Sequence, residues 1–144
     1  MSNFLNSNVI GSNSNSLNNS KKMSSKKITT QEVANRLIEL CRKGQVLEAQ
    51  QELFAADVIS HEPAHSPTPA AIGKEAVLAK GKHFASMIEV RHSGSFADPI
   101  VAGNYFSFVC KLDATLTGMG RVVWDEICVF GVKEGKIISE QFFY

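Results

Sequence analysis

The stretch HEPAH, residues 61–65, spells the zinc-metalloprotease motif H-E-x-x-H. In that motif two histidines one helical turn apart bind zinc, and the glutamate serves as general base. A continuous helix is required, but Pro63 is the third residue here and two more prolines follow, which disfavours a helix. The β-branched stretch 58–60 before it is typical of a strand. We therefore predict that His61 and His65 are loop histidines, with zinc binding as a distant alternative, and that no metal or organic cofactor is needed.

Two adjacent carboxylates, Asp125 and Glu126, lie within the apolar stretch VVWDEICVF, residues 122–130. Alternate side chains of a strand point to opposite faces, so each face carries one carboxylate among apolar residues. This pattern predicts that both faces are covered. An acid in such a setting has a raised pKa and can keep a proton, or is held by an arginine or a backbone donor. The alternation puts Glu126 and Asp125 on opposite faces, and a slip of one residue would exchange them.

Further residues could shape a ligand site. Phe106 and Phe108 alternate along a strand pattern, which is typical of a core and also of a pocket lined by core residues. We predict Trp124, Tyr144 and His83 as wall or mouth residues, although His83 also fits the exposed face of a helix.

The chain that positions these residues has 144 amino acids and a formal net charge of +1. This balance gives no basic surface for nucleic acid, and no apolar run approaches the length of a membrane helix. Three scattered cysteines favour reduced thiols and a cytoplasmic location. Residues 1–27 are rich in Asn and Ser and predict a disordered tail, so a single domain is expected over 28–144.

Helical patterns come first in this domain. Thr29 and Glu32 form a capping box that predicts a helix ending at Gly44. A second helix is predicted over 45–56, a strand over 58–62 and a third helix over 74–87. From residue 89 the pattern has a period of two and predicts strands over 89–97, 103–117, 120–131 and 135–144. This order predicts an α+β fold, with a curved antiparallel sheet wrapped over three helices and a pocket between them.

Three segments carry a resemblance to a known family: LIELCRKGQVLEAQQELFAADVISHEP, IGKEAVLAKGKHF and WDEICVFGVKEGKIISEQFFY. Over residues 28–144 the chain resembles the SnoaL-like branch of the nuclear transport factor 2-like superfamily. This superfamily includes ketosteroid isomerase, polyketide cyclases and non-catalytic binding proteins. The resemblance implies a cone-like α+β barrel.

The resemblance also implies roles for individual residues. Glu62, before Pro63, matches the general base of ketosteroid isomerase, and Glu126 matches its protonated acid. The tyrosine of the isomerase's oxyanion hole corresponds to Leu37, which disfavours steroid isomerisation.

Two classes of function follow from these residues. In the first, the chain binds a small hydrophobic molecule and Glu62 and Glu126 transfer a proton in an isomerisation, cyclisation or hydrolysis. In the second, it is a non-catalytic binding or interaction module. In both, the apolar residues Val123, Ile127 and Val129 predict a homodimer.

Overall fold

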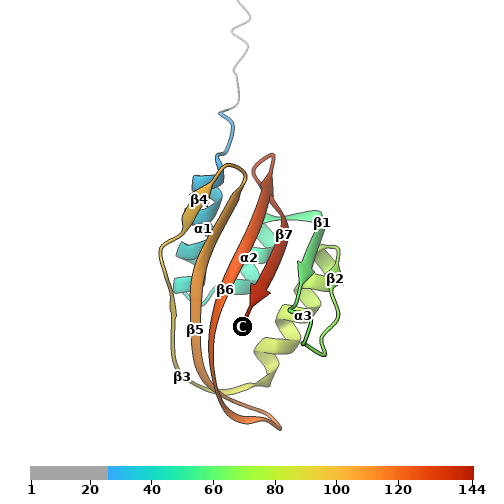
Figure 1. Cartoon of the computed structure of the whole chain (residues 1–144), viewed down its shortest axis with the longest axis vertical. Coiled ribbons are helices and arrows are strands. Elements are labelled where there is room, and N and C mark those ends of the chain that lie inside the picture. The colour runs from blue at the N-terminus through green and yellow to red at the C-terminus, as the bar shows by residue number, and fades with distance from the viewer. Residues whose placement is uncertain (1–25) are drawn as a thin grey trace, which may run out of the picture.

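The computed structural model describes residues 26–144, so nearly all of the predicted tail 1–27 lies outside the described residues. Figure 1 shows three helices against one strongly curved sheet. The helices are α1 (Thr30–Arg42), α2 (Val46–Leu53) and α3 (Lys74–Met87). The strands are β1 (Phe54–His61), β2 (Ala71–Ile72), β3 (Ile88–Phe96), β4 (Ile100–Ala102), β5 (Tyr105–Leu116), β6 (Gly120–Lys133) and β7 (Lys136–Phe143). Within residues 26–144 no helix is both long enough and apolar enough to cross a membrane.

The predicted capping box begins α1. The Thr29 side chain accepts from the backbone N–H of Glu32, and the Glu32 carboxylate accepts from the backbone N–H of Thr29. Both bonds satisfy N–H groups that the first helical turn leaves without partners. The predicted second helix ends earlier than expected, because Phe54 already begins β1 and is buried.

The sheet is mixed and does not close. Its strands run in the order β2-β1-β7-β6-β5-β3, and β4 pairs with β5. Every pairing is antiparallel except that β1 runs parallel to β7, with Ser60 opposite Glu140. The predicted α+β fold is confirmed. The prediction of an antiparallel sheet was wrong at one pairing, because β1 and β7, which are far apart in the chain, run parallel.

The core lies between the concave face of the sheet and the helices. Figure 1 shows α1 and α2 behind β5, β6 and β7, and α3 near β1. Phe106 stacks on Phe130 with ring centroids 4.8 Å apart, and Phe108 stacks on Phe130 at 5.4 Å. Val33 and Leu37 of α1 are buried in the same cluster.

Alternate residues of β6 point to the two faces as predicted. On the concave side Glu126 is half-buried and Cys128 is buried, whereas Asp125 is exposed on the convex side. On that convex side Val123 is 72% exposed and Ile127 is 50% exposed. The chain by itself therefore covers only one face of the strand.

Candidate functional site

The stretch 61–65 begins where β1 ends. His61 is the last residue of β1 and is exposed, and residues 62–65 leave the strand for a turn. The helix that the zinc motif requires is thus replaced by a strand end. No group of three metal-binding side chains gathers anywhere within the described part of the chain.

Glu62 is held by a lysine on α3. The Nζ atom of Lys80 lies 2.7 Å from Oε1 of Glu62 and 2.5 Å from Oγ of Ser60. The Lys80 side chain is 21% exposed and the Glu62 side chain is 13% exposed. An ion pair this far from solvent is screened less than a surface pair, so it fixes the carboxylate firmly.

The second oxygen of Glu62 is held by the residue that follows β7, the strand next to β1. The hydroxyl of Tyr144 donates to Oε2 of Glu62 at 3.1 Å. The Tyr144 ring packs edge-on against His65, with centroids 5.6 Å apart. Burial raises the pKa of Tyr144, and the charge of Glu62 raises that pKa further. Tyr144 therefore remains a hydrogen-bond donor over the whole neutral range.

Glu126 has a different environment from Glu62. Its one hydrogen-bonding neighbour among the described residues is the thiol of Cys128, which lies 3.6 Å from Oε1. Burial raises the pKa of Glu126 to about 7, and the negative charges of Glu62 and Glu140 raise it as well. The thiol and Lys80 act in the opposite direction. A carboxyl group with this pKa can both give and take a proton near neutral pH.

A third carboxyl, Glu140 on β7, completes the group. It is 3% exposed, and its Oε1 atom has no hydrogen-bond partner among the described residues. Burial raises its pKa, against the opposing effects of Ser60 and Lys80. We name Ser60, Glu62, Lys80, Glu126, Glu140 and Tyr144 the carboxyl cluster.

The other predicted site residues occupy different environments. Phe106 and Phe108 are 2% and 6% exposed and belong to the core stack. Trp124 is half-buried and packs against Phe84 of α3, with centroids 5.5 Å apart. His83, next to Phe84, is exposed. Of the predicted ligand-contacting residues, His83, Trp124 and Tyr144 reach solvent and could meet a ligand without unpacking the core.

Sequence reasoning missed Lys80, Ser60 and Glu140. For Lys80 a signal existed, because Val77, Lys80 and Phe84 follow the spacing of one helix face. A lysine in such a stripe indicates a buried partner for its charge. The role of Ser60 and Glu140 depends on the parallel pairing of β1 with β7, which no local pattern reveals.

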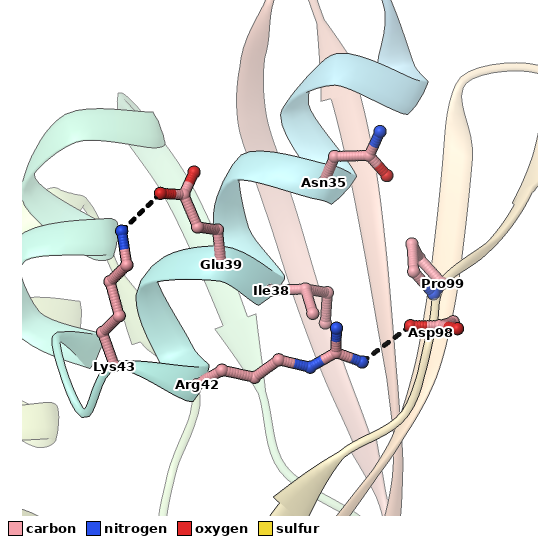
Figure 2. Close-up of a pocket in the computed structure, with 7 residues that line it drawn as sticks. All are labelled: Asn35, Ile38, Glu39, Arg42, Lys43, Asp98 and Pro99. Carbon is pink, nitrogen blue, oxygen red and sulfur yellow. Dashed lines mark hydrogen bonds and ion pairs between the residues drawn. The ribbon is translucent and has the colours of Figure 1, made fainter.

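A separate hollow of about 380 Å³ lies between α1 and the segment before β4. Figure 2 shows Arg42 directed at Asp98 and Lys43 directed at Glu39. The nitrogen–oxygen distances of these two ion pairs are 2.7 and 2.5 Å. These charges are paired with one another and exposed, whereas the carboxyl cluster holds buried carboxyls, one of them with an oxygen lacking a hydrogen-bond partner among the described residues. The carboxyl cluster is therefore the stronger candidate for chemistry.

The family model for the SnoaL-like domain matches residues 28–144. A proposed SnoaL-like polyketide cyclase from Mesorhizobium loti is 35% identical, and the match covers 81% of this chain and 100% of that one with a TM-score of 0.77. A protein of ketosteroid isomerase-like fold from Catenulispora acidiphila, in complex with trimethylamine, is 19% identical over 81% of this chain and 87% of its own, with a TM-score of 0.63.

IdmH, a proposed polyketide cyclase from Streptomyces antibioticus, is 17% identical over 80% of this chain and 91% of its own, with a TM-score of 0.60. At these lower identities the likeness concerns the fold alone. Among curated proteins, none matches the chain.

Proposed function

The chain belongs to the SnoaL-like domain family, and from this premise we propose that it binds a small hydrophobic molecule at the carboxyl cluster and transfers a proton within it. Glu62 takes the proton and Glu126 gives it. The reaction class is an isomerisation, cyclisation or hydrolysis that needs no redox step.

The observation that carries this proposal is the contrast between the two carboxyls. Glu62 is bound by an ammonium and a phenol, whereas Glu126 lacks a cationic contact among the described residues and has a pKa raised to about 7. Carboxyls whose environments differ in this way can divide the roles of base and acid. The half-buried Trp124 and Phe142 beside them offer apolar surface for the body of a substrate.

The test uses two isosteric variants and a matched control. We expect Glu62→Gln and Glu126→Gln each to lower turnover by a factor of about 100 or more, as general acid–base catalysis typically contributes. Asp125→Asn, on the convex face, is the control and should keep full activity. Substrates are sought first by native mass spectrometry of the purified protein, with identification of any small molecule released on denaturation. Full turnover in both glutamine variants would exclude the proposal.

One observation favours a second candidate, a non-catalytic binding module. The position that matches the isomerase's oxyanion-hole tyrosine is Leu37, which is 3% exposed within the core. The structurally similar protein from Catenulispora acidiphila forms a complex with trimethylamine. A binding module predicts that both glutamine variants retain the ligand and that the wild-type protein leaves it chemically unchanged.

We also propose that the convex face is a dimer interface. Val109, Ile127 and Phe143 lie in register across β5, β6 and β7, and Ile127 and Phe143 are 50% and 49% exposed. Adjacent exposed apolar side chains on a sheet are a liability unless another surface covers them. A second copy of the chain would cover them isologously. The predicted cytoplasmic location stays a prediction.

A further inference from the structure

The ammonium group of Lys80 is held by neighbouring side chains. An ammonium has three N–H donors, and two of them are directed at side-chain oxygens. The Nζ atom lies 2.5 Å from Oγ of Ser60 and 2.7 Å from Oε1 of Glu62, and 5.2 Å from the centroid of the Phe142 ring. Lys80 is therefore placed to orient Glu62 by direct contact.

The charges of the cluster do not balance in pairs. Three carboxyls, Glu62, Glu126 and Glu140, feel the charge of the single ammonium of Lys80, and of these Glu62 is the one in direct contact with it. Glu140 is paired across the sheet with Ser60, which also accepts from Lys80. Three ionised carboxylates this close would repel one another strongly. The position of the ammonium thus decides which carboxyl can hold a negative charge at least cost.

We propose that Lys80 is a positioning residue that divides the roles of the three carboxyls. It orients Glu62 toward the substrate as the base, and its positive charge makes it easier for Glu126 to release its proton. This inference rests on the proposed function for its catalytic meaning, but its test does not depend on turnover. The alternative is that Lys80 merely anchors α3 to the end of β1.

Several titratable or charged groups face Glu126 and can influence its titration. They come from every element packed against it: Lys80 on α3, Glu62 after β1, Cys110 on β5, Cys128 on β6, Glu140 on β7 and Tyr144 at the end of the chain. Lys80 is the one permanent cation in this set, so removing its charge should act on Glu126 even though the two side chains are not bonded.

The experiment is a carbon-13 NMR titration of the glutamate side-chain carboxyls in the full chain, with Glu126 assigned by Glu126→Gln. We expect Lys80→Met to raise the titration midpoint of Glu126 by roughly one pH unit, the lower end of what a nearby charge produces. Lys80→Arg keeps the charge and should restore the wild-type midpoint. Lys80→Gln keeps a donor but not the charge, and should behave like Lys80→Met. Asp125→Asn is the matched control and should leave the midpoint unchanged.

The results separate positioning from anchoring. If folded Lys80→Met and Lys80→Gln proteins lose thermal stability while the Glu126 midpoint stays in place, Lys80 is an anchor and the inference is overturned. If Lys80→Met does not fold, the Lys80→Gln titration decides alone. A shifted midpoint together with full turnover in the Glu62→Gln variant would support the electrostatic role of Lys80 and refute the proposed function separately.

Discussion

Tyr144 and Glu62, 82 positions apart in the chain, are joined by a hydrogen bond of 3.1 Å from the phenol to Oε2. With Lys80 on Oε1, the carboxylate is held at both oxygens. Each oxygen keeps a second lone pair, so the group is oriented without losing its capacity to accept. The residue that follows β7 thus fixes the direction of the proposed base.

Tyr144→Phe should weaken this orientation selectively. The variant keeps the ring that packs on His65 and loses only the hydroxyl. Because Tyr144 is 45% exposed, we expect a loss of about 1 kcal/mol, or roughly fivefold in kcat, with a smaller change in stability. Tyr105→Phe is the control, since Tyr105 is 61% exposed and far along β5. Equal kcat in both variants would contradict the role of the hydroxyl.

Glu126 should make the protein less stable as the pH rises from about 4.5 to 7. Its carboxyl binds a proton in the folded state up to about pH 7, whereas in the unfolded chain it loses the proton near its ordinary value of 4.5. Over this interval the folded state binds more protons, so the free energy of unfolding falls with pH and then levels off. Glu140 acts in the same direction.

Glu126→Gln removes this dependence. At pH 8 we expect it to be more stable than the wild type by about 1–3 kcal/mol, since each unit of pKa corresponds to about 1.4 kcal/mol. At pH 4.5 the two should differ little. Urea unfolding at both pH values measures the difference, with Asp125→Asn, whose partner Lys111 lies 3.2 Å away on the exposed face, as control. An equal difference at both pH values would refute the raised pKa.

Trp124 and Phe108 should respond differently to replacement by leucine. Phe108 is 6% exposed in the core stack, so Phe108→Leu should cost roughly 1–2 kcal/mol of stability and leave ligand affinity unchanged. Trp124 is half-buried and packs on Phe84, so Trp124→Leu should cost less stability and weaken the ligand about tenfold. Chemical denaturation measures the stability of both variants and ligand titration measures their affinity. A larger loss of affinity in Phe108→Leu than in Trp124→Leu would place the ligand against Phe108.

Ile127→Glu should prevent dimer formation without changing the cluster. In the proposed dimer, a carboxylate at position 127 would be buried against the same face of the second copy. Burying an unpaired charge in this way costs several kcal/mol. Light scattering after size exclusion should give a dimer for the wild type and a monomer for the variant. Lys82→Glu, exposed on α3 and away from the convex face, is the control. A monomeric wild type would exclude the proposed interface.

Local signals predicted much of the fold. The capping box at Thr29 and the change to a period of two after α3 define elements that depend on nearby residues. The junction of α2 and β1 was misplaced because Phe54 fits a buried helix face as well as a strand. β2 and β4 have two and three residues, too few for any periodicity to appear.

The candidate site was predicted in part. The alternation of side chains predicted that Glu126 and Asp125 lie on opposite faces, and β6 is regular there. The structure has Glu126 on the concave face, the residue that the family resemblance pointed to. The regular alternation of side chains is broken in β7. The pairing of β6 with β7 shifts register between Gly131 and Val132, and Ile137 is buried whereas Ile138 is exposed. Lys80 and Glu140 are brought to the same cluster only by the packing of distant segments, so their proximity is a property of the tertiary structure.

The parallel pairing of β1 with β7 also sets a time order for the cluster. β1 is complete at residue 61, yet its neighbour in the sheet begins at residue 136. During synthesis β1 must therefore wait, with one edge unpaired, until β7 has emerged. Glu140 and Tyr144 arrive with β7, so a nascent chain that stops before β7 has Glu62, Lys80 and Glu126 but not the whole carboxyl cluster. Contacts between such distant residues slow folding, and here they make the arrival of β7 and the assembly of the cluster the same event.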